Sequence, residues 1–208
     1  ADIINTDTEL SNLIPYVEAI KNAYPTQLIS IDTFNPVVAE QALNAGAHVI
    51  NDISGGSFDT KILEVVSKYN AGYIAMHVTG NPLTMHQIEE RTDIIAAIID
   101  DMEMKKELLN SFGIKNWVMD PGFGFGKTIQ ENFDIVKRLQ ELKVTNLPIL
   151  LGVSRKSSIY KTLGIGPEDA LNGTTVLHTL GLMNGASILR VHDVKEAKQI
   201  IQLLPYLQ

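Results

Sequence analysis

The chain has 208 residues, of which 45% are hydrophobic and 20% charged, and its formal net charge at pH 7 is −7. The length suits one domain, which we expect to cover residues 1–208, and the composition is that of a globular protein. There is no basic excess for a nucleic-acid surface, no apolar run long enough to span a membrane, and no cysteine for disulfide or thiolate chemistry. We therefore expect a cytoplasmic protein that binds neither nucleic acid nor a membrane.

Short apolar runs recur along the chain and predict buried parallel strands. They cover residues 28–31, 48–50, 73–76, 117–119, 149–151 and 188–191, and residues 1–4 look like one more strand. Stretches with apolar residues at helical spacing predict helices at residues 8–23, 36–44, 60–69, 93–112, 129–142, 167–183 and 194–207. This alternation predicts a parallel sheet with right-handed crossovers, either closed as a (β/α)8 barrel or open and doubly wound.

Polar residues follow the predicted strands at the ends where parallel α/β folds carry their reactive groups. They are Asp32, Asn51, Asp52, His77, Asp120, Ser154, Arg155, Lys156, Arg190 and His192. Each alone has an ordinary alternative, because polar side chains often cap the helix or turn after a strand. Together they predict a ring of ligand-binding residues. Since Arg190 and His192 are two residues apart, we expect both to point to one side of their strand.

Cationic residues concentrate in the second half of the chain. They are Lys127, Arg155, Lys156, Arg190 and His192, and in an acidic protein they predict a small anionic ligand.

The segment 120–128 is rich in glycine and suggests a nucleotide-binding loop, but its spacing excludes one. Pro121 stands where a Walker A loop needs glycine, and Lys127 stands at the third glycine of the dinucleotide pattern. We interpret the segment as a turn whose backbone approaches a flat ligand, with a tight ligand-free loop as the alternative.

Six blocks of the sequence resemble, in order, the motifs of the dihydropteroate synthase family of pterin-binding barrels. The blocks are Ile31-Asp32-Thr33, residues 45–56 (Ala-Gly-Ala through Asn-Asp-Ile-Ser-Gly-Gly), Met76-His77, residues 120–128, residues 152–157 (Gly-Val-Ser-Arg-Lys-Ser) and residues 190–193 (Arg-Val-His-Asp). The resemblance runs from about residue 1 to residue 200 and implies a (β/α)8 TIM barrel. Residues 1–4 resemble the family's second strand, so we expect the first strand and the mobile βα loops to be missing from this N-terminally incomplete sequence.

The resemblance implies a transferase of folate biosynthesis. It would condense 6-hydroxymethyl-7,8-dihydropterin diphosphate with p-aminobenzoate to give 7,8-dihydropteroate and pyrophosphate. Mg2+ is the implied cofactor, and its protein ligand is expected in a missing N-terminal loop, so none of the residues present is assigned to the metal. The family further implies a homodimer, formed through the late helices near residues 167–183, and makes sulfonamides candidate inhibitors.

The family's motifs also assign a role to each matching residue. The catalytic group is Asp32, Asp120, Lys156 and Arg190. The pterin-binding group is Asp32, Asn51, Met76, Asp120, Gly152, Lys156 and Arg190. Pyrophosphate would contact Asn51, Arg190 and His192, and p-aminobenzoate would contact Phe125, Ser154, Lys156 and Ser157, the last at the start of a helix. We expect His77 to be structural and Asp52 to cap the turn that follows it.

Two alternative functions stay open at this point. A methyltetrahydrofolate-dependent corrinoid methyltransferase has a similar fold and pterin pocket, but it has no reason to carry Lys156 with Ser157 or Arg190 with His192. A non-catalytic pterin-binding barrel is the second alternative, because the missing loops hold part of the catalytic apparatus.

Overall fold

The computed structural model describes residues 5–81, 83–85, 87–88 and 91–206, so the strand predicted at residues 1–4 lies outside the described residues. The chain divides into two compact units. The first unit contains residues 1–83 and 104–118, and the second contains residues 84–103 and 119–208. Helix α4 (Ile94–Ser111) and strand β4 (Trp117–Asp120) therefore have residues in both units.

Short strands form where the apolar runs predict them. One sheet has the order β1-β2-β3-β4, with β1 (Ser30–Asp32), β2 (Val49–Asp52) and β3 (Gly72–Met76) parallel to one another. In the second unit β5 (Leu150–Leu151) pairs in parallel with β6 (Ile188–Leu189), and Met119 forms a parallel bridge with Ile149. Parallel pairing places the carboxyl ends of neighbouring strands side by side.

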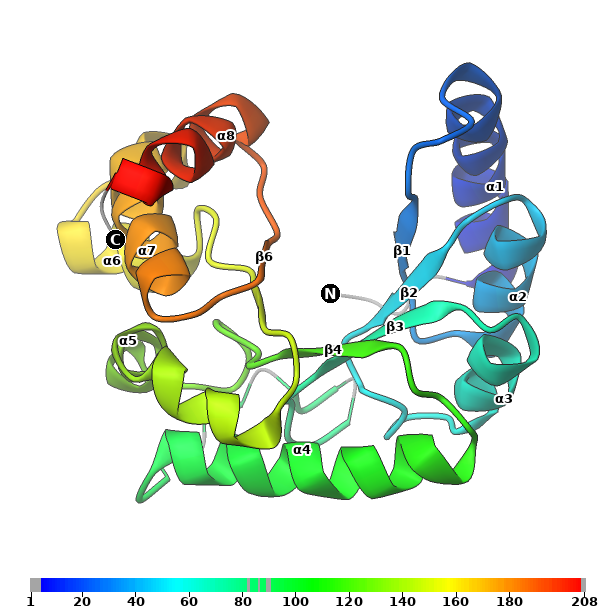
Figure 1. The fold of residues 1–208 in the computed structure, drawn as a ribbon, viewed down its shortest axis with the longest axis horizontal. Helices are drawn as coiled ribbons and strands as arrows, with labels where there is room; N and C mark the ends of the chain where they lie inside the picture. The colour runs from blue at the N-terminus through cyan, green and yellow to red at the C-terminus, as the bar shows by residue number, and fades with distance from the viewer. Residues whose placement is uncertain (1–4, 82, 86, 89–90, 207–208) are drawn as a thin grey trace. The chain divides into compact units, whose positions relative to one another are not determined.

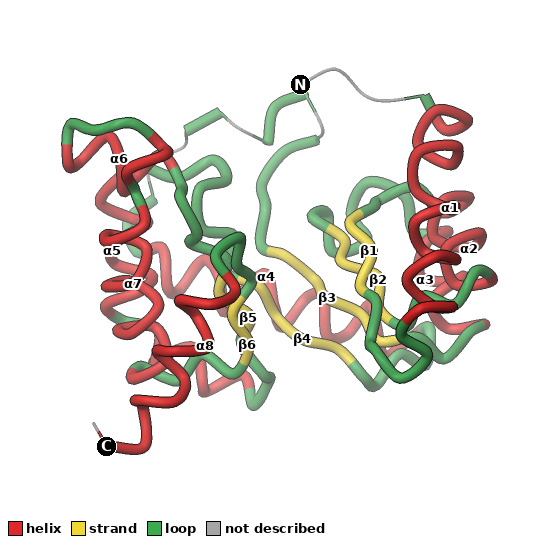
Figure 2. The backbone as a smooth tube through the Cα atoms, turned by 90° about the horizontal axis from the view of Figure 1, so that it is seen from above, coloured by secondary structure: helices red, strands yellow, loops and turns green. Residues whose placement is uncertain are grey.

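Three helices of the first unit lie side by side along β1–β3 (Figures 1 and 2). They are α1 (Thr6–Ala23), α2 (Pro36–Asn44) and α3 (Lys61–Lys68). Helix α2 shows why they form: Asn35 caps it by accepting a bond from the Val37 amide, and Pro36 supplies a fixed φ at the first position. Its buried side chains, Val38, Ala39, Ala42 and Leu43, repeat at helical spacing, so one face packs into the core.

The second unit contains α5 (Ile129–Lys137), α6 (Ser157–Leu163), α7 (Leu171–Met183) and α8 (Val194–Leu203). Three 3-10 helices, η1 (Leu139–Thr145), η2 (Pro167–Asp169) and η3 (Leu204–Tyr206), extend or precede them. None of the helices formed by the described residues has the length and hydropathy needed to cross a membrane.

Two predicted helices are interrupted in the structure. The helix expected at residues 129–142 ends at Lys137 and continues as η1, because Leu139, Leu142 and Thr145 are buried at intervals of three residues, the period of a 3-10 helix. The helix expected at residues 167–183 begins as η2 and becomes α-helical only at Leu171. The apolar pattern located both helical segments, but it did not distinguish the two helical periods.

Candidate active site

In the first unit the structure brings Asp32 and Asn51 together. These residues are register partners at the carboxyl ends of β1 and β2, and the Asn51 side-chain amide donates to Asp32 Oδ1. Asn51 is buried, whereas Asp32 is exposed. The buried amide therefore holds the exposed carboxylate in place through this hydrogen bond. Met76 lies buried at the end of β3. The predicted position of all three at strand ends is confirmed.

Asp52 caps a turn, as predicted. Its carboxylate accepts bonds from the Ser54 amide at 2.7 Å, the Gly56 amide at 2.9 Å and the Tyr73 hydroxyl at 2.6 Å. Burial, followed by the charge and hydrogen bond of Asp52, raises the pKa of Tyr73 well above its usual value. His77 is also buried, directly after β3. Asp52 therefore shapes the backbone beside Asn51.

In the second unit Asp120 is a buried carboxylate with cations around it. It ends β4, and its Oδ1 accepts a bond from the Gly122 amide at 2.8 Å. Burial raises the pKa of Asp120, while the Gly122 N–H and the positive charges of Lys127, Lys156 and Arg190 act in the opposite direction. The charges of Lys156 and Arg190, two residues predicted to bind substrate, thus act on the pKa of Asp120.

Lys156 lies against the loop that follows β4. Its Nζ is 4.4 Å from the centre of the Phe125 ring, a cation–π arrangement. Gly124 has a φ of +87°, and a Cβ at this position would lie 3.2 Å from Lys156 Cδ, so glycine permits both the turn and the close approach. Lys156 is also the N-cap residue of α6, which begins at Ser157 as predicted.

His192 is oriented by Ser154. The Ser154 Oγ lies 3.0 Å from His192 Nδ1 and accepts a bond from the His192 amide at 3.3 Å. His192 and Arg190 are both exposed, and a Cβ on Gly152 would lie 3.7 Å from Arg190 Cβ. The expectation that Arg190 and His192 end a strand is wrong, because β6 stops at Leu189. The serine–histidine contact, rather than strand periodicity, therefore orients His192.

Arg155 and Lys127, two of the five clustered cations, bind groups that fix loops of the protein. Arg155 forms a two-pronged ion pair with Asp193, with Nε–Oδ2 and Nη2–Oδ1 distances of 2.9 Å, and it donates to the carbonyls of Pro167 and Glu168. Lys127 is buried and donates to backbone carbonyls of its own loop. The interpretation of the whole cluster as a ligand-binding group therefore needs correction: Arg155 and Lys127 shape loops.

Sequence reasoning missed the polar residues that brace the loop after β4. Thr128 and Glu131 form a capping box at the start of α5, and Asn132 bonds to the loop backbone. The spacing of threonine and glutamate three residues apart is a known N-terminal signal and could have revealed the first pair. Asn132 leaves no comparable pattern.

Within the described ranges, no three His, Asp or Glu side chains gather in a group that could hold a metal ion. The described residues therefore do not by themselves fit a resident metal centre.

The parallel α/β architecture, with carboxylate, amide and cationic groups after successive strands, has the character of a (β/α)8-barrel enzyme. A model of the family described as pterin binding enzymes matches residues 1–192. The chain therefore belongs to the pterin-binding enzyme family.

Individual relatives identify the particular enzyme of this family that the chain resembles. Dihydropteroate synthase of Synechocystis is 37% identical, over 98% of this chain and 71% of the relative. A folic acid synthesis protein of Pneumocystis carinii is 39% identical over 97% of this chain, which spans only 28% of that protein.

Solved structures agree with the sequence relatives. The dihydropteroate synthase of Clostridium difficile, crystallised in the presence of pteroic acid, is 36% identical with a TM-score of 0.93, covering 100% of this chain and 77% of that one. The Yersinia pestis enzyme, solved as a sulfonamide drug complex, is 32% identical with a TM-score of 0.95, covering 100% and 75%. The predicted barrel fold class and the predicted resemblance to dihydropteroate synthase, a transferase of folate synthesis, are confirmed.

Proposed function

We propose that the protein catalyses the dihydropteroate synthase reaction. The amine of p-aminobenzoate forms a C–N bond to the CH2 group of 6-hydroxymethyl-7,8-dihydropterin diphosphate, the C–O bond to the diphosphate breaks, pyrophosphate leaves, and the amine releases a proton. The observation that carries the proposal is Asp120, a buried carboxylate acted on by the charges of Lys156 and Arg190. A corrinoid methyltransferase would not need these two cations.

The pterin is recognised by carboxylate and amide groups in this proposal. The N–H donors of its guanidine-like edge suit the Asp120 carboxylate. Asn51, which the family's motifs also assign to the pterin, has a donor and an acceptor in its side chain. Asp32 adds a second negative charge, which favours the positive charge that develops on the CH2 group as pyrophosphate departs. Met76 and Gly152 supply apolar and close-packed contacts to the ring.

The p-aminobenzoate would occupy the neighbourhood of Phe125, Lys156 and Ser157. The Phe125 ring, which already faces Lys156 Nζ, provides an aromatic wall, and the lysine supplies a cation for a carboxylate. Ser154 is better placed to orient His192 than to contact the benzoate, given its hydrogen bonds. A sulfonamide, which the Yersinia enzyme binds, would compete for the same place.

In this proposal Arg190 and His192 of the second unit hold the diphosphate. Arg190 offers a planar fork of donors, and Ser154 leaves His192 Nε2 available to a phosphate oxygen if the imidazole is oriented as in the structure. We propose that Mg2+ enters with the substrate, bound mainly by phosphate oxygens, because the described residues contain no metal-binding cluster.

The proposal extends to the organisation and place of action of the protein. We propose that residues 1–208 belong to one barrel domain, because the family model spans residues 1–192. We also propose that the protein acts in the cytoplasm, with which the absence of cysteine is compatible.

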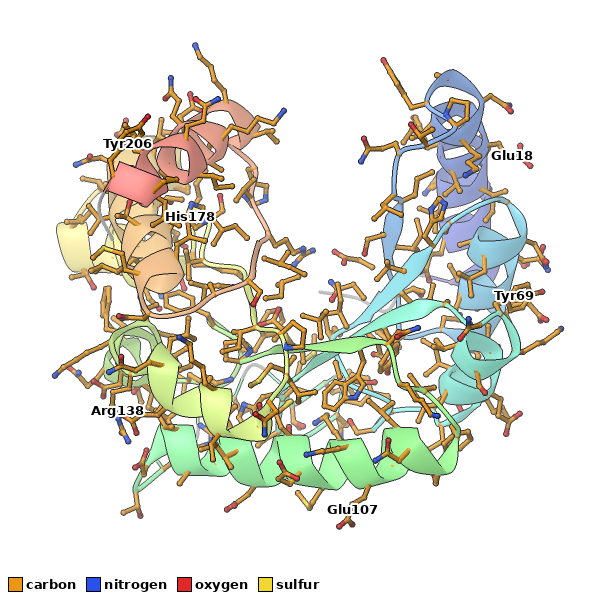
Figure 3. All side chains as sticks on the ribbon, viewed as in Figure 1. Glu18, Tyr69, Glu107, Arg138, His178 and Tyr206 are labelled. Atoms are coloured by element: carbon orange, nitrogen blue, oxygen red, sulfur yellow. The ribbon has the colours of Figure 1, made fainter. Side chains whose placement is uncertain are left out.

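A homodimer through α7 is also part of this proposal. Val176, Leu180 and Met183 lie on one face of α7 and are 51%, 44% and 49% exposed, and Tyr206, labelled in Figure 3, is 86% exposed. An apolar surface of this kind is typical of a protein interface. Light scattering should give a dimer mass for the full-length protein and a monomer mass for Leu180→Glu. The exposed Tyr16→Glu on α1 is the control, and a monomeric wild type would contradict the proposal.

The catalytic proposal is tested with the full-length protein. The assay supplies the pterin diphosphate, labelled p-aminobenzoate and Mg2+, and it measures labelled dihydropteroate. Lys156→Ala and Arg190→Ala should each lower kcat/KM by about 100-fold or more, because each removes a charge that stabilises substrate or leaving group. Lys161→Ala, an exposed lysine on the same helix as the Lys156 cap, should stay within about 2-fold of wild type.

Each outcome of this assay separates the synthase from the alternatives. Product that disappears in both site variants but not in the control supports the synthase. Tight pterin binding with no product from the wild type would overturn the catalytic proposal and favour a non-catalytic pterin-binding barrel.

A further inference from the structure

The loop after β4, residues 122–128, folds around its own lysine. Lys127 Nζ donates to the Gly122 carbonyl at 2.8 Å and to the Phe125 carbonyl at 3.1 Å. The lysine is only 5% exposed. A buried ammonium group bound to backbone carbonyls draws the two ends of the turn inward, so the side chain acts as an internal brace.

Two further side chains brace the same loop from outside. Arg91 Nη1 donates to the Gly126 carbonyl at 3.1 Å. Asn132 accepts a bond from the Gly124 amide at 2.6 Å and donates to the Thr128 carbonyl at 2.9 Å. Successive backbone groups of the loop thus have specific side-chain partners, which is how a glycine-rich segment with little intrinsic rigidity is held in one conformation.

The braced loop carries residues of the proposed site. Phe125, whose carbonyl is bound by Lys127, faces Lys156 with its ring, and Gly122 donates its amide to Asp120. Asp120 belongs to a strand, so its position depends less on the loop than that of Phe125. Movement of the loop would therefore affect the aromatic wall more than the carboxylate.

We propose that Lys127 is a positioning residue that fixes the Gly122–Thr128 loop so that Phe125 and Lys156 form the p-aminobenzoate site. This inference rests on the proposed synthase function. In this inference Lys127 affects substrate binding without touching the substrate, because it acts through the backbone of Phe125. Asn132, which belongs to α5, supports the same loop by accepting a bond from the Gly124 amide.

Hydrogen-bond donation, rather than charge alone, is the property that the loop requires. The charges acting on Lys127 are Arg91, which disfavours its protonated form, and Asp120, Glu131 and Asp101, which favour it. A neutral amine still has two N–H groups, enough for both carbonyls. Removal of the nitrogen, unlike loss of a proton, therefore leaves both carbonyls without this partner.

The test measures the two substrate KM values separately in full-length Lys127→Met, which keeps most of the stem but has no donor. The KM for p-aminobenzoate should rise by about 10-fold or more, since small displacements at a binding site have large effects on rate and affinity. The KM for the pterin diphosphate should change by less than about 3-fold. Lys137→Met, an exposed lysine of α5, is the matched control and should behave as wild type.

A second variant guards against misfolding. Asn132→Leu removes the side-chain amide that bonds to the Gly124 N–H and the Thr128 carbonyl. It should raise the KM for p-aminobenzoate but not the KM for the pterin diphosphate. If Lys127→Met folds and its KM for p-aminobenzoate is unchanged, the inference is overturned. If Lys127→Met does not fold, an unchanged KM for p-aminobenzoate in Asn132→Leu overturns it. Absence of product from the wild type would instead overturn the proposed function, and it is seen before any variant is made.

Discussion

Two glycine-rich turns of the molecule are organised around buried charges of opposite sign. In the first unit the Asp52 carboxylate accepts hydrogen bonds from the amides of Ser54 and Gly56 and from the hydroxyl of Tyr73. In the second unit the Lys127 ammonium donates hydrogen bonds to the carbonyls of Gly122 and Phe125. One turn therefore directs its N–H groups inward, and the other directs its C=O groups inward.

The sign of the central charge decides which backbone groups each turn leaves for other partners. A turn whose N–H groups are occupied by a carboxylate presents mainly side chains to a ligand, and Asn51 stands directly before Asp52 in the strand. A turn whose carbonyls are occupied by a lysine has N–H groups left to bind carboxylates or amides, as Gly122 does with Asp120 and Gly124 does with Asn132. The charge at the centre of each turn thus determines which backbone groups of the turn remain for other side chains.

Removal of the Asp52 carboxylate should lower the stability of the protein more than any other change proposed for the two turns. Asp52→Ala leaves the buried Ser54 amide and Tyr73 hydroxyl without their acceptor and removes one of the two acceptors of the Gly56 amide, so the free energy of unfolding should fall by about 3 to 5 kcal/mol. Urea unfolding of the full-length protein measures this loss.

Tyr73→Phe is the matched control for that experiment. It removes one of the three donors and leaves both amide bonds to Asp52 in place, so it should cost only about 1 kcal/mol. Equal losses for Asp52→Ala and Tyr73→Phe would mean that the backbone bonds contribute nothing, and the comparison between the two turns would fail.

The two turns also differ in how far the sequence predicts them. The cap at Asp52 is predicted, and its structure is local: the aspartate stands two residues before Ser-Gly-Gly, and it accepts bonds from residues two and four positions later. The sequence alone places Lys127 among the ligand-binding cations, since a lysine after a glycine-rich segment has the same local signature whether it binds phosphate or its own backbone. Its partners are local, but its burial depends on Arg91 and on α5, which sequence spacing does not bring together.

Similar limits apply to the rest of the fold and site. Strand positions and the bounds of α2 follow from apolar periodicity and from Asn35-Pro36, and both are local signals. The pairing of Arg155 with Asp193 crosses 38 residues and depends on the packing of the loops after β5 and β6. Asp120, Lys156 and Arg190 were predicted because each follows a strand, and strand ends are the part of a parallel fold that sequence locates best.

The smaller effect concerns the pH dependence of the turn built on Lys127. Burial, together with the charge of Arg91, lowers the pKa of Lys127 from 10.5 to about 7. Below about pH 7 the lysine carries its proton in both the folded and unfolded states, and the folded state bears the full cost of the buried charge. Between about 7 and 10.5 the unfolded chain binds more protons than the folded one, so the wild type becomes more stable as the pH rises.

Comparison with Lys127→Met isolates this contribution, because methionine does not titrate. The stability of the wild type relative to Lys127→Met should increase by about 2 kcal/mol between about pH 7 and pH 9, measured by urea unfolding at each pH. Lys137→Met should differ from the wild type by a constant amount over the same window. A constant difference for Lys127→Met as well would show that the two loop carbonyls hold the proton on the lysine. The second turn would then carry a permanent charge, as the mirror image of the first.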